Sequence, residues 1–258
     1  MMKQTPKISI ITVVYNGQQF LEGTIKSVMN QTYSNIEYLI IDGKSKDKTV
    51  DIIKDYEPHI SQWISERDKG LYDAMNKGLK MATGDFVLFM NAGDRLASPT
   101  VLEQVFSNYD DATDVLYGEV MMVDEDRKPL GTRTEITTRK LPNDLSWKSM
   151  KLGMVVCHQA FIPRLALCPF FMDNNLSADI DWVINILKKS RKNTNCNMVI
   201  ADFLIGGVSK QRHRQSLKDR YNVLQRHFGI LPNFLNHIWI IIRAIWFKIS
   251  RVGKATYS

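Results

Sequence analysis

The sequence predicts an α/β protein, built on an open, mostly parallel twisted sheet that is flanked by helices. In the first half of the chain, short β-branched runs alternate with helical patterns, which is typical of βαβ units. Of the 258 residues, 44% are apolar, enough for a substantial core. No GxGxxG motif follows the first strand-like run, and no GxxxxGK[ST] motif occurs anywhere in the sequence. These absences argue against a Rossmann dinucleotide enzyme and a P-loop NTPase.

The elements of the first half follow from apolar runs and their spacing. Strands buried on both faces are predicted where β-branched and aromatic residues cluster, at residues 8–14, 36–41 and 86–90, with a shorter strand at 60–65. Helices are predicted where apolar residues recur at helical spacing, at residues 20–29, 49–56, 71–81 and 101–106. Pro99 marks the entry to the last of these helices.

Beyond residue 110 the order is looser. A strand at 115–123 is expected to pass through a charged turn to a hairpin partner at 129–134. A helix follows at 181–188, and a late strand at 198–205. Because no internal repeat or linker is visible, we predict one domain over residues 1–210 and a basic amphipathic helical tail over 211–258.

Charge is distributed unevenly along the chain. The net charge is +7, yet residues 203–258 contain ten Lys or Arg and one acid, so the positive excess lies in the tail. Such asymmetry indicates an anionic partner surface, either a membrane leaflet or nucleic acid. The three cysteines include no CxxC pair, which excludes a zinc ribbon or disulfide framework and fits a reducing compartment. We expect no signal peptide and a cytoplasmic protein.

Polar residues follow three of the predicted strands. They are Tyr15-Asn16-Gly17, Asp42-Gly43 and Asn91-Ala92-Gly93-Asp94. In open α/β sheets, ligands bind beyond the carboxyl ends of the strands, so these segments are candidates for one site. A nucleotide diphosphate without a glycine-rich cradle needs another positive charge, and Asp94 is placed to hold Mg²⁺ or Mn²⁺ for it. The alternative is that Asp94 caps the following helix or sits in a turn.

Five segments resemble family 2 glycosyltransferases of the GT-A fold. Residues 9–49 are similar to the N-terminal half of that family, and residues 65–94 (SERDKGLYDAMNKGLKMATGDFVLFMNAGD) resemble its colanic-acid-type polysaccharide biosynthesis branch. The other matches are residues 157–160 (CHQA), 177–179 (SAD) and 206–209 (GGVS). The five segments occur in the family's order and span about residues 8–210.

The resemblance implies an inverting, metal-dependent transfer of a sugar from a nucleotide-diphosphate donor. Asp179 takes the position of the catalytic base and Asp94 that of the metal-binding aspartate, with Mn²⁺ or Mg²⁺ as cofactor. The implied substrate-binding residues are Thr12, Tyr15 and Asn16 in the nucleotide pocket, Asp42 at the base, Asp68 and Lys69 near the ribose or diphosphate, and Asp73, Asn91 and His158. Many members carry acids where this chain has Asn91 and Gly93. We therefore expect free metal to bind weakly and in a donor-dependent way.

Simpler interpretations exist for several of these residues. Asp179 could be the N-cap of a helix that begins near Ile180, and Asp181 is a rival base. His158 could be a satisfied core histidine, Lys69 a surface charge, and Asp73 part of a packed helix. Cys157 lies next to His158, but adjacent residues on a strand face opposite sides, so a thiol nucleophile is excluded.

The tail combines apolar, aromatic and basic residues over 234–249 (FLNHIWIIIRAIWFKI). Its longest uncharged apolar run, residues 238–242, is short of the roughly 20 residues that span a bilayer. Flanking basic residues favour a helix that lies in the interface of an anionic membrane. Packing against the domain and a homodimer contact are the alternatives. Nucleic acid is not expected as a partner, because the basic segment 210–226 contains no aromatic residue except Tyr221.

We therefore expect a cytoplasmic transferase, peripheral on the inner face of the plasma membrane, that acts in surface polysaccharide biosynthesis. Its donor is a nucleotide-sugar, with a UDP-sugar first, and its acceptor is a lipid-linked saccharide. One alternative is a membrane-peripheral nucleotide-sugar-binding protein on an inactive transferase fold, which predicts loss of Asp94 or Asp179, although both are present. A sugar nucleotidyltransferase is the other, but residues 13–19 lack its glycine-rich, basic loop.

Overall fold

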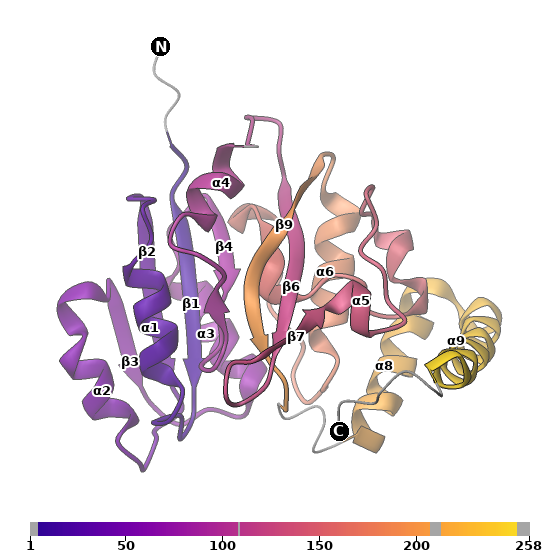
Figure 1. The fold of residues 1–258 in the computed structure, drawn as a ribbon, viewed down its shortest axis with the longest axis horizontal. Coiled ribbons are helices and arrows are strands. Elements are labelled where there is room, and N and C mark those ends of the chain that lie inside the picture. Colours follow the sequence, from indigo (N-terminus) through magenta and orange to yellow (C-terminus); the bar gives the residue numbers. More distant parts are fainter. Residues whose placement is uncertain (1–4, 108, 207–212, 252–258) are drawn as a thin grey trace.

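The parallel sheet forms the first half of the protein (Figure 1). The structure is a computed structural model, which describes residues 5–107, 109–206 and 213–251. The strand order is β3-β2-β1-β4, and all neighbours are parallel. The strands are β1 (Ile8–Val14), β2 (Ile36–Asp42), β3 (Gln62–Ser65) and β4 (Phe86–Phe89). All seven residues of β1 are buried, because this strand is central and both of its faces are covered.

Helices cover both faces of this sheet. One apolar cluster packs α1, α2 and α4 against residues such as Ile8 and Ile40, and the other packs α3 against Ile11 and Leu39. The helices are α1 (Leu21–Met29), α2 (Thr49–Asp55), α3 (Leu71–Met81) and α4 (Val101–Ser107). The predicted elements of this half are confirmed, with ends that differ by at most two residues.

A second, mixed sheet lies beside the first, in the order β5-β9-β6-β7, and β8 also pairs with β6. Its strands are β5 (Arg95–Leu96), β6 (Val115–Val123), β7 (Pro129–Thr132), β8 (Phe161–Pro163) and β9 (Asn193–Leu204). Strands β6 and β9 are parallel, and the other pairs are antiparallel. Strand β9 begins five residues before the predicted start. Its first five residues, NTNCN, are polar and give no strand signal, but they are held in the strand by pairing with β6.

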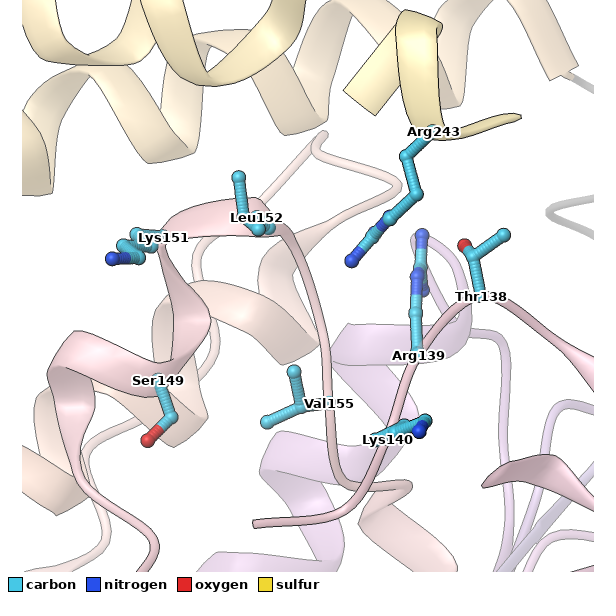
Figure 2. A pocket seen from close by; sticks show the side chains of 8 residues that line it. All are labelled: Thr138, Arg139, Lys140, Ser149, Lys151, Leu152, Val155 and Arg243. Atoms are coloured by element: carbon cyan, nitrogen blue, oxygen red, sulfur yellow. The ribbon is translucent and has the colours of Figure 1, made fainter. Parts of the chain in front are cut away.

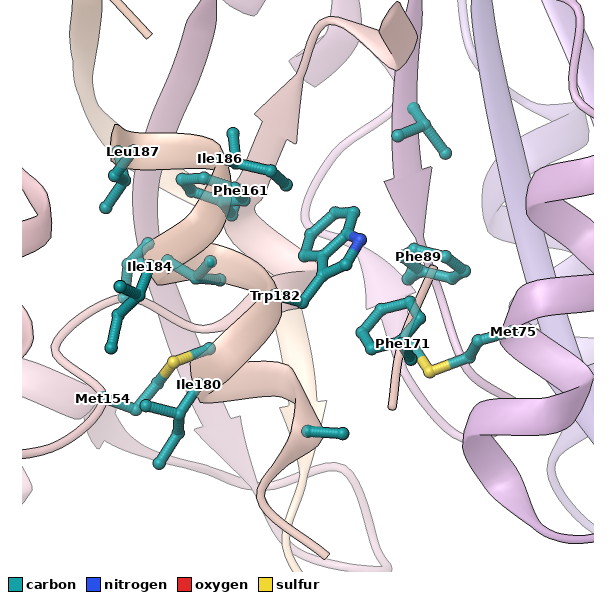
Figure 3. Close-up of a cluster of buried hydrophobic side chains, with 14 of the residues drawn as sticks. Met75, Phe89, Met154, Phe161, Phe171, Ile180, Trp182, Ile184, Ile186 and Leu187 are labelled. Carbon is teal, nitrogen blue, oxygen red and sulfur yellow. The ribbon is translucent and has the colours of Figure 1, made fainter. Parts of the chain in front are cut away.

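Helix α6 (Ala178–Lys189) joins the two halves through Trp182, which is 1% exposed. The Trp182 ring stacks on Phe171 at 4.9 Å between centroids and meets the edge of Phe89 at 5.6 Å (Figure 3). Its Nε1 donates a hydrogen bond of 2.9 Å to the Pro169 carbonyl. A large aromatic side chain with a satisfied polar atom fixes the first turn of α6, where Asp179 lies. The remaining short elements are α5 (Arg133–Ile136) and 3₁₀ turns at Glu57–His59, Trp147–Leu152, His158–Ala160 and Leu165–Leu167.

The two C-terminal helices differ from each other. In α8 (His213–Phe228), Val223 and Leu224 are fully buried and belong to the main core cluster. In α9 (Ile230–Arg251), most large apolar side chains are exposed, including Trp239 at 54% and Trp246 at 69%. The segment Ile230–Phe247 is long and apolar enough to cross a membrane by length and composition alone, which corrects the expectation that the tail falls far short of this. The predicted boundary at residue 210 lies outside the described residues and stays a prediction.

Candidate active site

Three loops meet at the carboxyl edge of the parallel sheet, at the lower side of Figure 1. They follow β1, β2 and β3, and Gly43 lies where they touch. A Cβ added to Gly43 would come within 2.7 Å of the Asp68 carboxylate and 3.3 Å of the Tyr15 ring. A larger residue here would have to displace the Asp68 carboxylate, so glycine lets the β2 loop lie against both side chains without such a shift.

Around the end of β1, most polar groups bind one another, whereas one aromatic ring is free. Asn16 accepts a hydrogen bond of 2.9 Å from the Lys46 amide, and Asp42 is buried and accepts from Ser45 and from Ser65 at 2.5 Å. Tyr15 is 62% exposed. The loops are thus fixed internally, and Tyr15 presents an open ring face to a planar ligand.

Thr12 lies inside the sheet rather than at its edge. Its side chain is fully buried, and its hydroxyl donates to the Met90 carbonyl at 2.8 Å and lies 3.1 Å from the Tyr38 hydroxyl. The hydroxyl is therefore occupied by strands β2 and β4. Thr12 fixes the spacing of the strand ends, and its predicted contact with a nucleotide does not match this placement.

Three acidic side chains, from the loop before α3 and from the first turn of α3, surround one lysine of that helix. Lys77 Nζ lies 2.5 Å from Asp68, 2.9 Å from Glu66 and 3.8 Å from Asp73. Burial raises the pKa of Asp68, and Lys77 partly offsets this effect. Asp73 accepts the Lys69 backbone amide at 3.0 Å, so it orders the turn into α3, while the Lys69 side chain is exposed.

Asp94 is the most strongly perturbed group at this edge. It is 5% exposed, and its two oxygens accept hydrogen bonds from the Leu204 amide at 3.0 Å and from Gln159 Nε2 at 2.8 Å. Burial raises the pKa of Asp94 to about 7, although both hydrogen bonds and the Arg127 charge favour the ionised form. The interpretation of Asp94 as a helix cap is not supported, since neither oxygen binds an amide of α4.

Several buried polar atoms close to Asp94 have no partner among the described residues. They include Asn91 Oδ1, the two terminal nitrogens of Arg127 and Nε of Arg95. Asn91 Nδ2 lies 3.2 Å from His158 Nε2, which leaves Oδ1 open. Buried polar groups normally find partners, so unpartnered atoms that gather in one place indicate room for a polar ligand.

The oxygen atoms of this edge fit a divalent cation that arrives with a diphosphate. Asn91 Oδ1 accepts no hydrogen bond within residues 5–107, 109–206 and 213–251, and it lies in the same turn as the Asp94 carboxylate. Mg²⁺ and Mn²⁺ prefer such oxygen ligands. Within the described ranges, no group of three or more His, Cys, Asp or Glu side chains could hold a metal by itself. The donor set thus fits shared coordination with phosphate oxygens and not a complete protein site.

Two aspartates of α6 have different surroundings. Asp181 accepts hydrogen bonds from His227 at 2.7 Å and from Asn185 at 2.8 Å, so it ties α6 to α8. Asp179 accepts from its neighbour, the Ile180 amide, at 2.9 Å, and its carboxylate also interacts with the Tyr72 hydroxyl. The helix begins at Ala178 with Ser177 as its N-cap, so the N-cap interpretation of Asp179 is wrong. Asp181 is therefore used to hold α6 against α8, whereas Asp179 makes no contact of this kind within the described part of the chain.

His158 and Tyr72 lie near Asp179. Burial lowers the pKa of His158, the Asp179 carboxylate opposes this effect, and a neutral imidazole results. Burial, followed by the charge of Asp179, raises the pKa of Tyr72 well above its usual value. Burial also raises the pKa of Cys157, which accords with the exclusion of a thiolate nucleophile.

Sequence reasoning missed Tyr72, Arg127 and Gln159 as parts of this edge. Gln159 lies in the CHQA segment and Tyr72 in the YDAMN segment, so both lie within motifs that were noted. Arg127 lies in a charged turn that looks like any surface turn. It comes near Asp94 because β6 leads into that turn while pairing with β9, whose Leu204 binds Asp94.

Comparisons of the sequence identify its relatives. The model of the family described as "Glycosyl transferase family 2" matches residues 9–167. A PGL/p-HBAD biosynthesis glycosyltransferase of Mycobacterium bovis is 31% identical over 188 residues, which cover 70% of this chain and 69% of that protein. An uncharacterized glycosyltransferase of Mycobacterium tuberculosis is 41% identical over 104 residues, and the chain spans 40% of its length.

Solved structures share the fold at low sequence identity. Staphylococcus aureus TarS in complex with UDP-GlcNAc superposes with a TM-score of 0.68 at 18% identity, covering 84% of this chain and 64% of that one. The mannosyltransferase PcManGT from Pyrobaculum calidifontis, in complex with GDP-Man and Mn²⁺, gives 0.68 at 15% identity, covering 98% and 77%. The predicted GT-A fold is thereby confirmed. Because the family model matches more than half of its residues, the chain belongs to glycosyl transferase family 2.

Proposed function

We propose that this family 2 glycosyltransferase transfers one sugar, with inversion, from a nucleotide-diphosphate donor to a hydroxyl of a lipid-linked saccharide. UDP-sugar is the first candidate donor, and surface polysaccharide biosynthesis of the colanic-acid type is the proposed setting. A relative named for PGL/p-HBAD biosynthesis is in keeping with a role in cell-surface glycans. The observation that carries the proposal is the set of unpartnered buried polar atoms around Asp94 at the carboxyl edge of the sheet.

The donor is proposed to bind along the three strand ends. The nucleobase stacks on the exposed ring of Tyr15, and Asn16 and Asp42 hold the surrounding loops in shape. Lys69 reaches the ribose or diphosphate from the loop whose geometry Asp73 fixes. Arg127, whose terminal nitrogens find no acceptor in the part of the chain that the structure describes, is suited to the anionic diphosphate. Two solved neighbours hold UDP-GlcNAc and GDP-Man, which supports a nucleotide-sugar donor of this general kind.

Asp94 and Asn91 are the residues proposed to hold a divalent cation, Mn²⁺ or Mg²⁺. A bound cation would stabilise the negative charge that develops on the departing nucleoside diphosphate. Gln159 and the Leu204 amide orient the Asp94 carboxylate through its two hydrogen bonds. These two hydrogen bonds keep the Asp94 carboxylate in place when no donor is bound.

Asp179 is proposed to accept the proton of the acceptor hydroxyl as the new bond forms. Inversion requires a single displacement through an oxocarbenium-like state, and a carboxylate on the acceptor side assists it. Asp179 lies in the first turn of α6, at the positive end of the helix dipole. Neutral His158, between Asn91 and Asp179, is placed to contact the donor diphosphate or the acceptor.

Helix α9 supports a membrane-associated location at the inner face of the plasma membrane. Its exposed Trp239, Trp246 and isoleucines form an apolar surface that other described elements leave open. Trp residues are favoured at the interface between lipid and water, and basic residues of the tail suit an anionic leaflet. The acceptor is therefore proposed to be presented by the membrane on which α9 rests.

Thermal unfolding with UDP, GDP, dTDP and CDP, each with and without Mn²⁺, tests this function. A ligand at about 100 times its dissociation constant stabilises a protein by about 2.7 kcal/mol. At about 2–4 °C per kcal/mol for a chain of this size, we expect a shift of several degrees with one nucleotide and Mn²⁺. If no nucleotide shifts the unfolding temperature under either condition, the proposed donor site is refuted.

A further inference from the structure

A second cluster of cationic side chains lies apart from the strand ends, beneath α9. It surrounds a cavity of about 350 Å³ between the loop that follows α5, the Trp147–Leu152 turn and α9. Its lining includes Arg139, Lys140, Lys151 and Arg243, and no acidic residue is among the described residues that line it. Figure 2 shows Arg139 and Arg243 extending into the same space from the loop and from the helix.

The positive charges of this cluster have no counterion within the described ranges. Burial, and then the charges of Arg133, Arg220 and Arg243, lower the pKa of Arg139 to about 9. Nε of Arg220 and Nε of Arg243 are buried and lack hydrogen-bond acceptors. Arg139 and Arg133 instead share one neutral acceptor, the Met154 carbonyl, at 3.3 and 2.9 Å. Like charges held this closely destabilise a protein unless an anion joins them.

Backbone geometry keeps the cluster together. Gly153 has φ of +98°, and a Cβ added there would lie 3.6 Å from Arg139 Nη2 and 3.9 Å from Arg220 Cδ. A glycine in this left-handed conformation turns the chain between the two arginines. The guanidinium groups therefore come together through a defined turn and not through chance surface proximity.

The cluster continues toward the proposed active site. Arg133 lies 3.1 Å from Cys157 Sγ, and Cys157 precedes His158 in the chain. The opposite side of the cavity is α9, whose neighbouring apolar side chains are exposed. A ligand seated here would have an apolar helix on one side and the candidate catalytic edge on the other.

We propose that this cavity binds the diphosphate of the lipid-linked saccharide acceptor, with its lipid chain along α9 and its sugar directed toward Asp179. Several guanidinium groups match phosphate oxygens in charge and geometry. The volume is at the lower end for small-molecule sites, which suits a diphosphate rather than a whole oligosaccharide. This inference rests on the proposed transferase function, which it extends by locating the acceptor.

Binding of farnesyl diphosphate and inorganic pyrophosphate, measured by calorimetry in EDTA on the full chain, tests the proposal. EDTA removes the cation on which the donor site is proposed to depend. The wild type is expected to bind farnesyl diphosphate more tightly than pyrophosphate, because α9 adds apolar contact. The double variant Arg139→Gln, Arg243→Gln is expected to bind both at least about tenfold more weakly.

The double variant Arg191→Gln, Arg214→Gln is the matched control, because both arginines are exposed, lie outside the cavity and together remove the same two charges. This control is expected to keep wild-type affinity. Without ligand, the Arg139→Gln, Arg243→Gln variant is expected to unfold at or above the wild-type temperature, since repulsion among arginines is relieved. A purely structural role for Arg139 and Arg243 predicts a lower unfolding temperature instead.

Wild-type affinity in the Arg139→Gln, Arg243→Gln double variant would overturn the proposal. Equal affinity of the wild type for farnesyl diphosphate and pyrophosphate would overturn the claim that the lipid chain of the ligand contacts α9. Binding to vesicles of phosphatidylcholine, with and without phosphatidylglycerol, distinguishes a phospholipid headgroup from the acceptor diphosphate as the ligand of the cavity. If the double variant loses binding to the anionic vesicles yet retains farnesyl diphosphate, the cavity takes a phospholipid headgroup and not the acceptor. Nucleotide binding with Mn²⁺ should survive in the double variant. This measurement therefore distinguishes failure of the proposed donor site from failure of the proposed acceptor cavity.

Discussion

Glu37 and Asp94 are two carboxylates, each 5% exposed, at opposite ends of the parallel sheet. Burial alone would raise the pKa of both side chains. Glu37, on β2, accepts hydrogen bonds from Ser9 at 2.5 Å, from the Thr83 amide and hydroxyl at 2.7 and 2.5 Å, and from Lys7 at 2.9 Å. These donors outweigh burial and lower the pKa of Glu37 to about 2.

Asp94 receives two hydrogen bonds, and burial prevails, which raises its pKa to about 7. The unpartnered Asn91 Oδ1 and Arg127 nitrogens lie at the same end. The difference teaches that the amino end of the sheet satisfies its charge internally and gains stability. The carboxyl end leaves polar groups incomplete, in the way that a ligand-binding site does.

Replacing the proposed base should have the largest effect on activity. Asp179→Asn is expected to lower the transfer rate about 10²–10⁴-fold, because the acceptor proton loses its carboxylate. Nucleotide binding should be retained, which single-turnover and binding measurements separate. Asp181→Asn is the matched control, with near wild-type transfer and lower stability because His227 loses its partner. Near wild-type transfer by Asp179→Asn would refute the assignment.

Glu37→Gln should affect stability and not chemistry. We expect a loss of about 2 kcal/mol of unfolding free energy at pH 7, with unchanged activity per folded molecule. The folded pKa of Glu37 lies below its unfolded value, so its contribution is present above about pH 4.5 and is lost as the pH falls toward 2. Urea unfolding at pH 7 and pH 3 should therefore show the gap between variant and wild type narrowing. A gap that is constant or wider at pH 3 would contradict this account.

Of the three substitutions, Tyr15→Ala should have the smallest effect, and this effect should be on nucleotide affinity. Stacking of a base on an aromatic ring contributes about 1–3 kcal/mol, and we expect the lower end because Tyr15 is 62% exposed. The dissociation constant for the nucleotide should rise several-fold, while the unfolding temperature without ligand stays the same. Titration calorimetry with Tyr15→Phe as the control checks this. Unchanged affinity in Tyr15→Ala would remove the ring from the proposed donor site.

Much of the fold could be predicted from the sequence, where burial leaves a clear pattern. Strand β1 and helix α3 have the predicted ends, since their buried residues form a continuous apolar run in the strand and recur at helical spacing in the helix. Strand β5 has two residues, and the start of β9 is polar, so neither carries a local signal. Their pairing depends on contacts between distant segments.

The candidate site divides in the same way. Asn91, Asp94 and the Tyr15 loop follow strands, so topology alone predicts that they share an edge. Arg127 joins Asp94, and Arg139 joins Arg243, only through tertiary packing, which no local spacing encodes. The resemblance to a known family supplied Asp179, whereas the structure separates it from Asp181 by their hydrogen-bond partners.

Calorimetric titration of Asp94→Asn and Glu37→Gln with the preferred nucleoside diphosphate and Mn²⁺ tests the central claim most directly. If the carboxyl end of the sheet is the donor site and the amino end is structural, Asp94→Asn should bind at least about tenfold more weakly, and Glu37→Gln should bind as the wild type does. Wild-type affinity in Asp94→Asn, or a comparable loss in the folded Glu37→Gln variant, would contradict the distinction between the two ends.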